Sequence, residues 1–351
     1  MGSEQQIVQR KQIKCVVWDL DNTLWDGILL EDEAVTLRPE LLSVLQKLDE
    51  RGILHSIASK NDHDTAVSKL KELGIYDYFL YPQISWQAKS TSIQHIARLL
   101  NIGIDTLAFI DDQAFERDEV AYALPDVLCL DAQQIATLVD RAEMLPDTIT
   151  ADARRRRLMY LSEIERQKAE KDFTGTNEEF LTTLKMVFTI SRAHEQDLKR
   201  AEELTVRTHQ LNTTGYTYSY EELRALLGSS RHRLIIAELE DKYGSYGKIG
   251  LVLLECEEKI WTIKLLLMSC RVISRGVGSI LLSYIIQAAR RARVQLRAEF
   301  ISNDRNRMML VTYKFHGFKP IKQDGNFTLF EYSSDVVPAF PDYVQVIAEE
   351  L

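Results

Sequence analysis

The sequence predicts an α/β protein in which a doubly wound parallel sheet is followed by a second domain of α+β type. Between residues 11 and 145, short apolar runs alternate with helical patterns, which is typical of parallel strands connected by helices. From residue 184 to 351, runs such as 234–239 and 248–255 indicate antiparallel neighbours. The intervening residues 146–183 are charged and helical in pattern, so we expect them to be a linker. A chain of 351 residues is long enough for two such domains.

The composition excludes several classes of protein. A formal net charge of −9 argues against a nucleic-acid partner, because nucleic-acid binders are normally basic. No apolar run is long enough to span a membrane, and the N-terminus has no signal-peptide pattern. The 4 cysteines are widely spaced and form no CxxC pair, which argues against a zinc site or a disulfide framework. We therefore expect a cytoplasmic protein with no membrane partner.

The first domain divides into strand and helix segments in strict alternation. We expect strands at residues 15–18, 53–58, 78–81 and 107–110. A helix should follow Pro39 and end at Gly52, and a second should end at Gly74. A third should run from Lys89 to Leu100. These connections imply a parallel sheet whose strands all present their carboxyl ends to one edge.

Polar residues follow these predicted strands at the edge where ligands bind in open α/β sheets. Two carboxylates one residue apart can hold a divalent cation while one of them still reaches a phosphorus atom. A hydroxyl and a lysine can bind the transferring oxygens, and a second carboxylate pair can complete a metal site. Each of these residues alone could be an Asp-Asn turn, a helix cap or a surface lysine. Their order along the chain is what indicates a phosphoryl-transfer site. The residues are Asp19, Asp21, Thr23, Ser59, Asn61, Lys89, Asp111 and Asp112.

Residues 14–118 resemble the haloacid dehalogenase (HAD) phosphatase superfamily. The resemblance implies that Asp19 is the nucleophile, that Asp21 is the general acid/base, and that Ser59 and Lys89 bind phosphate. It also implies Mg²⁺ as the cofactor, an aspartyl-phosphate intermediate and a metal site formed by Asp19, Asp21, Asp111 and Asp112. Thr23 and Asn61 would contact the phosphate. Residues 22–38 and 60–88 are too short for the cap domains of such phosphatases, so we expect a capless HAD-like domain.

The second domain contains a strand, a glycine-bearing turn and a helix in succession. We expect strands at 185–190, 261–268 and 296–300, a helix at 197–208, and another helix at 279–293 after Gly276 and Gly278. A helix that starts directly after such a turn is a good site for a phosphate group. The run from Tyr313 to Phe318 closes the pattern.

This arrangement resembles the acyl-CoA-binding half of the GNAT acetyltransferase superfamily, which grips a phosphopantetheine arm beside its fourth strand. Ile273 stands where that superfamily usually has Arg or Gln, so a phosphopantetheine on an acyl carrier protein is a better donor or acceptor than free acetyl-CoA. The residues that we expect at this site are His209, Asn212, Arg271, Gly276, Gly278 and Tyr313.

Cys270 lies at the end of the predicted strand 261–268, beside the turn where a pantetheine thiol would arrive. A thiol there could accept an acyl group and pass it on by transthioesterification. A small buried filler residue is the alternative. Cys15 is the competing thiol, but it precedes Asp19 by four residues and so lies at the wrong end of its strand.

Both halves together resemble the FkbH-like proteins of polyketide biosynthesis. The resemblance is carried by the segments 14–25, 109–119, 210–212 and 269–277, although His209 and Gln113 stand where asparagine is usual. It implies a glyceryl transferase/phosphatase that takes 1,3-bisphosphoglycerate, a small phosphorylated three-carbon acid, and loads a glyceryl unit onto an acyl carrier protein through a cysteine thioester. The alternatives are lactyl loading, a simple phosphatase with a C-terminal lid, and a non-catalytic docking module.

Overall fold

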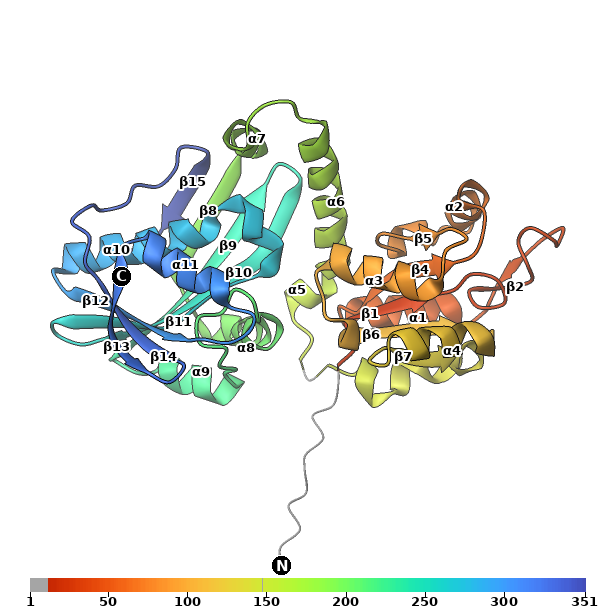
Figure 1. Cartoon of the computed structure of the whole chain (residues 1–351), viewed down its shortest axis with the longest axis horizontal. Coiled ribbons are helices and arrows are strands. Elements are labelled where there is room, and N and C mark those ends of the chain that lie inside the picture. The colour runs from red at the N-terminus through yellow and green to blue at the C-terminus, as the bar shows by residue number, and fades with distance from the viewer. Residues whose placement is uncertain (1–11, 147) are drawn as a thin grey trace, which may run out of the picture. The chain divides into compact units, whose positions relative to one another are not determined.

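A computed structural model of the chain describes residues 12–146 and 148–351 (Figure 1). The chain divides into two compact units, the first ending at Leu161 and the second beginning at Ser162. The division falls inside helix α6 (Arg156–Asp172), within the stretch 146–183 that we predicted as a linker. The limits of the two functional domains remain a prediction, and each unit is described by itself.

Unit 1 is built on a parallel sheet with the strand order β5-β4-β1-β6-β7. This order confirms the doubly wound parallel sheet expected from the sequence, with β1 at its centre. A small antiparallel pair, β2 and β3, stands outside the sheet. The strands of unit 1 are β1 (Cys15–Trp18), β2 (Trp25–Asp26), β3 (Thr36–Leu37), β4 (Leu54–Ser59), β5 (Gln83–Ile84), β6 (Leu107–Asp111) and β7 (Leu128–Asp131).

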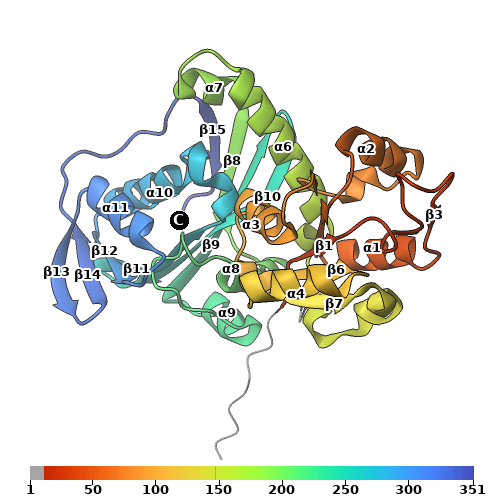
Figure 2. The same cartoon turned by 45° about the vertical axis from the view of Figure 1, so that its right-hand side comes forward.

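Helices cover both faces of this sheet (Figures 1 and 2). The apolar face of α1 packs on alternate residues of β1, Val16 and Trp18, because side chains along a strand point to opposite faces in turn. Helices α3 and α4 pack beside one another on the other face. The helices are α1 (Leu41–Glu50), α2 (His63–Glu72), α3 (Lys89–Leu100), α4 (Ala114–Ala123) and α5 (Ala151–Arg154), with short 3-10 turns η1 (Tyr76–Tyr78), η2 (Ile104–Thr106), η3 (Ala132–Asp140) and η4 (Ala142–Met144).

One predicted strand of unit 1 is wrong. Residues 78–81 were expected to be a strand, but Tyr78 ends η1 and Tyr81 has a left-handed φ of 51°. A strand cannot continue through that backbone conformation. Only Phe79 makes an isolated bridge, to His55, and the edge strand β5 begins after the turn.

Unit 2 contains a mixed sheet with the strand order β13-β14-β12-β11-β10-β9-β8-β15. The antiparallel pairing of β9 with β10 confirms that part of the prediction, and β11 and β12 are parallel. We expected the pattern of elements to end at Phe318. Instead, Phe318 begins β13, and two more strands follow it. The strands are β8 (Met186–Arg192), β9 (His232–Asp241), β10 (Gly244–Cys256), β11 (Ile260–Met268), β12 (Gln295–Ile301), β13 (Phe318–Asp324), β14 (Phe327–Tyr332) and β15 (Val344–Ala348).

Two cores lie on the two faces of this sheet. Helix α10 packs on one face, where Ile235 and Ala237 of β9 point, and α8 and α9 pack on the other, where Leu234 and Ile236 point. No helix in the described residues is both long and apolar enough to cross a membrane. The helices are α7 (Asn177–Leu184), α8 (Leu198–Arg207), α9 (Tyr220–Leu227), α10 (Val277–Ala292) and α11 (Arg307–Phe315), with η5 (Glu195–Asp197) and η6 (Cys270–Arg275).

Candidate metal and phosphoryl-transfer site

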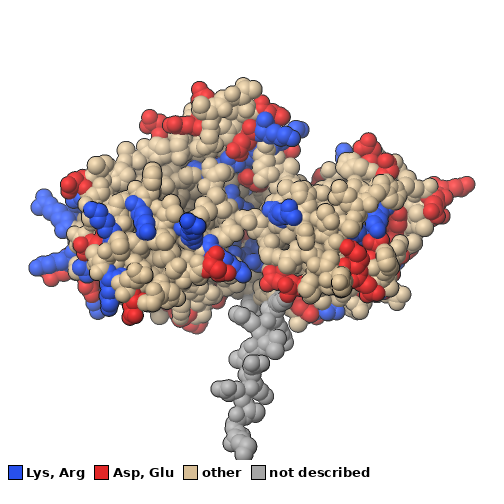
Figure 3. All heavy atoms as spheres, in the orientation of Figure 1, with Lys and Arg blue, Asp and Glu red and all other residues tan. Residues whose placement is uncertain are grey.

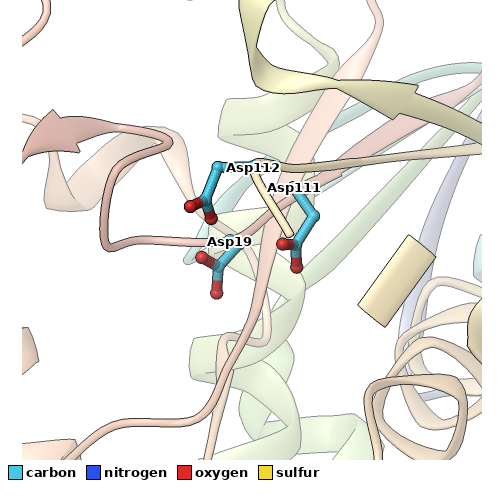
Figure 4. A group of neighbouring side chains, drawn as sticks. All are labelled: Asp19, Asp111 and Asp112. Carbon is cyan, nitrogen blue, oxygen red and sulfur yellow. The ribbon is translucent and has the colours of Figure 1, made fainter. Parts of the chain in front are cut away.

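Three carboxylates come together at the carboxyl edge of the unit 1 sheet. Strands β1 and β6 are parallel and pair in register up to Trp18 and Ile110, so the residues that follow emerge side by side. The Asp19 amide donates to the Ile110 carbonyl at 2.9 Å, which fixes this juxtaposition. Oxygens of Asp19, Asp111 and Asp112 all lie within 4.8 Å of one another, and Figure 4 shows the three side chains gathered in one place.

Lys89 joins this group as the first residue of α3. Its ammonium donates to Asp19 Oδ1 at 2.8 Å and to Asp111 Oδ2, and all three side chains are buried. Burial alone would lower the pKa of Lys89, but the attraction of the two carboxylates outweighs it and the pKa is raised. Lys89 is therefore a permanent cation between two aspartates.

The electrostatic balance of the group is incomplete without a further cation. Burial is the main cause that raises the pKa of Asp19 to about 7; the Lys89 ammonium opposes this shift and the Asp111 carboxylate adds to it. Burial, followed by the charge of Asp111, also raises the pKa of Asp112. Three carboxylates thus share one ammonium group, and further positive charge would be stabilising.

The residues present fit a divalent cation. Asp112 Oδ1 is buried and has no hydrogen-bond partner among the described residues, although buried carboxylate oxygens are normally paired. Mg²⁺ prefers oxygen ligands and commonly binds through one or two carboxylates together with phosphate oxygens. Asp19, Asp111 and Asp112 could hold such an ion, and Asp112 Oδ1 is the atom that most requires one.

The Asp21 side chain lies outside this group of three, although we predicted it as a metal ligand. Its Oδ1 accepts hydrogen bonds from Trp25 Nε1 at 2.9 Å and from the Leu29 amide at 3.0 Å. Its Oδ2 accepts one from Asn61 Nδ2 at 2.9 Å. The β2–β3 hairpin and Asn61 thus hold the Asp21 carboxylate in place. This geometry suits a proton-transfer group rather than a side-chain ligand, and Asn61 contacts Asp21.

Ser59 and Thr23 occupy different positions around the group. Ser59 ends β4, is buried, and its hydroxyl bonds to Asp19. Thr23 Oγ1 accepts the Asp112 amide at 3.2 Å and is fully buried, so Thr23 positions the Asp112 backbone. The predicted phosphate contact is therefore supported by the position of Ser59 more than by that of Thr23.

The start of α4 contributes residues that sequence reasoning did not assign. Glu119 accepts hydrogen bonds from the Ser90 hydroxyl at 2.5 Å and the Ser90 amide at 3.3 Å, and so caps α3 beside Lys89. This cap matters because the N-cap residue, Ala88, has no side chain that could serve. Arg117 donates to the Asp111 carbonyl at 2.8 Å and pairs with Asp131 at 2.7 Å. Both belong to segment 109–119, where the family resemblance was the only available signal.

Neither segment that could carry a cap domain does so. Residues 22–38 hold only the two-residue strands β2 and β3, and residues 60–88 hold α2, η1 and β5. The prediction of a capless site in unit 1 is consistent with these elements.

In unit 2, several residues that we predicted for an acyl site follow the end of β11. Cys270 is half-buried and begins η6 directly after the strand. Gly276 has a left-handed φ of 71° and joins η6 to α10. A Cβ atom there would lie 2.5 Å from the Tyr343 hydroxyl, so Tyr343 covers the start of α10 at Gly276, next to Gly278. Arg271 is half-buried, and its Nε lies 3.5 Å from Ser269 Oγ.

The neighbouring Arg275 is buried and paired with Glu163 at 3.3 Å and with Glu170 at 3.1 Å. Both carboxylates belong to α6, so this arginine holds that helix against the start of α10. It is therefore engaged within the protein instead of facing a phosphate.

The other predicted residues of this site divide into buried and exposed positions. Asn212 and Tyr313 are fully buried, whereas His209 is exposed. Asn212 Oδ1 accepts the amides of Thr214 at 3.0 Å and Gly215 at 2.8 Å, so Asn212 stabilises its own turn. The Tyr313 hydroxyl is buried, and its polar neighbour is the Thr213 side chain.

The cysteines differ in their capacity for thiol chemistry. Cys15 begins β1 and is fully buried, and burial raises the pKa of its thiol far above the ordinary value. Burial also raises the pKa of Cys129 to about 11 and that of Cys256 to a lesser extent. None of the four cysteines, all of which lie in the described residues, forms a disulfide. Cys270 is thus the cysteine whose position best suits a nucleophile.

Solved structures that are similar to this chain include a phosphatase domain and acetyltransferases. The N-terminal part of a Bacteroides fragilis protein, which contains a phosphatase domain and is complexed with Mg, is 31% identical over 35% of this chain and 37% of that one, with a TM-score of 0.33. The ribosomal-protein-S18-alanine N-acetyltransferase from Escherichia coli is 16% identical over 44% of this chain and 99% of its own, with a TM-score of 0.33. The PaiA N-acetyltransferase from Thermoplasma acidophilum, in complex with coenzyme A, is 15% identical over 42% of this chain and 99% of its own, with a TM-score of 0.34.

No family model and no curated protein matches the chain. The chain spans little more than a third of the solved N-terminal part of the Bacteroides protein. The solved structures similar to it therefore include a Mg-containing phosphatase domain and acetyltransferases, each over less than half of its length. The fold class is α/β, with a parallel sheet in unit 1 and a mixed sheet in unit 2.

Proposed function

We propose that unit 1 is a Mg²⁺-dependent phosphatase in which Asp19 is the nucleophile, and that the whole chain is a glyceryl transferase/phosphatase of the FkbH-like kind. The observation that carries the phosphatase part is the convergence of Asp19, Asp111 and Asp112 around the unpartnered Asp112 Oδ1. The resemblance of the sequence to FkbH-like proteins carries the transferase part. The cysteines, which form no disulfide, agree with a cytoplasmic enzyme.

In unit 1, each residue has a distinct role in phosphoryl transfer. A bound Mg²⁺ would neutralise charge on the phosphate. The Asp19 carboxylate attacks phosphorus, the bond from phosphorus to the leaving oxygen breaks, and Asp21 delivers the proton that this oxygen requires. Lys89 stabilises the negative charge that develops on the phosphoryl oxygens, and the Ser59 hydroxyl orients them. Water then hydrolyses the aspartyl phosphate.

In unit 2, the proposed chemistry is acyl transfer through Cys270. Its thiolate attacks the acyl-phosphate carbonyl of 1,3-bisphosphoglycerate, and inorganic phosphate leaves with the electron pair of the broken carbon–oxygen bond. The thioester formed still carries a phosphate ester, which is the substrate for Asp19. The phosphopantetheine thiol of a carrier protein then attacks the glyceryl thioester, and the Cys270 thiolate leaves. An acyl phosphate is already activated, so this sequence needs no ATP.

Intact-protein mass spectrometry tests the proposal. Enzyme, Mg²⁺, 1,3-bisphosphoglycerate and a holo carrier protein are mixed, and we expect a glyceryl group on the carrier and release of phosphate. Asp19→Asn should stop removal of the phosphate ester, and Cys270→Ala should stop acylation of the enzyme. A lactyl mass on the carrier would identify the alternative cargo. No acylated protein under any of these conditions would contradict the transferase part alone.

A second candidate, a phosphatase without acyl transfer, is favoured by one observation in unit 2. The protein's own residues Leu211–Thr213 pair with the end of β11, the strand beside whose end we expected a pantetheine thiol to arrive. Release of phosphate with no acylation of either protein would support this candidate. A chain in which neither reaction occurs would instead be a docking module.

A further inference from the structure

The parallel strands β11 and β12 separate part of the way along their length. They pair from Ile260 and Gln295 to Ile263 and Ala298, although β11 continues to Met268. Beyond the paired part, the side chains of Lys264 and Glu299 join the two strands. The sheet therefore has a split whose walls are strand edges with main-chain hydrogen-bonding groups.

The segment Leu211–Thr213 lies in this split as a short antiparallel strand. The Thr213 amide donates to the Leu266 carbonyl at 3.1 Å, and the Met268 amide donates to the Leu211 carbonyl at 2.9 Å. The Leu266 amide donates to the Thr213 hydroxyl at 3.0 Å. All three residues of the segment are buried. The free edge of β11 is thus satisfied by the protein itself.

The same segment is also attached to the β12 side of the split. The Ile301 amide donates to the Thr213 carbonyl at 3.0 Å, and Asn306 Nδ2 donates to the Asn212 carbonyl at 3.1 Å. The segment therefore bridges both walls. While these bonds are made, an extended, amide-bearing arm cannot use the Leu266 amide, the Leu266 carbonyl or the Met268 amide, because each of these groups already has a partner. As the structure stands, the split does not fit a phosphopantetheine arm.

We propose that Leu211–Thr213 is a displaceable strand that closes this split in the resting protein, and that acyl transfer in unit 2 requires its release. The inference rests on the proposed carrier-loading function. The segment is short, since it consists of three residues between α8 and α9, and it follows an exposed residue, His209. Release would open the β11 edge up to Met268, two residues before Cys270, and would uncover the Tyr313 hydroxyl, whose polar neighbour is the Thr213 side chain.

Hydrogen exchange tests the displacement without any carrier protein. Peptides spanning residues 208–216 should exchange by a local opening, faster than peptides of the central strand β10. Thr213→Val removes the acceptor of the Leu266 amide and should speed that local exchange about fivefold, the effect of one hydrogen bond. Thr183→Val, whose hydroxyl bonds to the Phe180 carbonyl at 2.7 Å away from the split, should leave it unchanged. Exchange of 208–216 only together with β10 would overturn the proposal.

A reversible lock tests the link to acyl transfer. Asn212 and Leu267 form an antiparallel bridge in which the flanking residues make the hydrogen bonds, so their Cα atoms are about 4.5 Å apart and suit a disulfide. The oxidised double variant Asn212→Cys, Leu267→Cys should lose carrier acylation at least about tenfold and recover it on reduction. Equal acylation by the oxidised and reduced forms would overturn the proposal. If the wild-type protein acylates no carrier, the proposed function fails. Hydrogen exchange in the presence of free 4′-phosphopantetheine then still tests the displaceable strand. Faster exchange of residues 208–216 would support the displaceable strand, and unchanged exchange would contradict it.

Discussion

Replacing Lys89 by Met would remove the only ammonium group that pairs with the buried carboxylates in the described site. The Lys89 side chain is 4% exposed, and its partners Asp19 and Asp111 are 6% and 0% exposed. Removing one partner of a buried ion pair costs about 3–5 kcal/mol, because the remaining charge is left uncompensated. For a unit of this size, that loss corresponds to a decrease of roughly 6–20 °C in melting temperature.

The matched control is the same substitution at Lys60. Its side chain is 35% exposed and pairs with Glu116 at 2.6 Å, so Lys60→Met should cost about 1 kcal/mol or less. Thermal unfolding of metal-free protein at pH 8 measures both effects. Added Mg²⁺ should stabilise the Lys89 variant more than the wild type, because it supplies the missing positive charge. Equal melting temperatures for the two variants, or no extra effect of Mg²⁺, would refute this account of the site.

Three further predictions concern pH and thiol chemistry. Asp19 has a pKa of about 7 and must lose its proton to bind Mg²⁺, so Mg²⁺ should bind about 30-fold more weakly at pH 5.5 than at high pH. Titration calorimetry measures this difference, and equal affinities would contradict the prediction. Burial lowers the pKa of His55 to about 3, so the folded state disfavours the protonated imidazole. The free energy of unfolding should therefore be highest above pH 6.5 and should fall by about 2 kcal/mol at pH 5. Urea unfolding should show this pH dependence in the wild type and a smaller one in His55→Gln. Cys270→Ser should abolish acylation of the protein by 1,3-bisphosphoglycerate while Cys15→Ser retains it, and intact mass after mixing would show the reverse if the strand-end argument is wrong.

The sequence was sufficient for the three central strands of the unit 1 sheet, β4, β1 and β6, and for most of the residues at their carboxyl ends, whereas the outer strands β5 and β7 were not predicted. Apolar runs followed by polar residues define parallel strands and their carboxyl ends, so the approach of Asp19, Asp111 and Lys89 follows from topology alone. The side-chain directions could not be derived in this way. The Asp21 carboxylate accepts hydrogen bonds from Trp25 and from the backbone of the β2–β3 hairpin, so it lies outside the group of three carboxylates. The spacing of residues in the sequence does not predict these hydrogen bonds.

In unit 2, the sequence predicted the order of the central elements but not the contacts between distant segments. His209 and Asn212 were expected at the acyl site, whereas Asn212 and its two neighbours lie within the sheet and His209 is exposed. Pairing of a three-residue segment with strands more than fifty residues away along the chain leaves no periodic pattern. Tyr343 beside Gly276 is a similar long-range contact, and it depends on the C-terminal strand β15 that the sequence did not reveal.

The most direct test of the central claim is titration of Mg²⁺ into the wild type and into Asp112→Asn, with Asp131→Asn as the control. Asp131 ends β7 and pairs with Arg117, outside the group of three carboxylates. We predict one Mg²⁺ per chain in the wild type and the control, and binding at least about tenfold weaker in Asp112→Asn. Equal binding by all three proteins, or no binding by the wild type, would contradict the claim that these aspartates form a metal site.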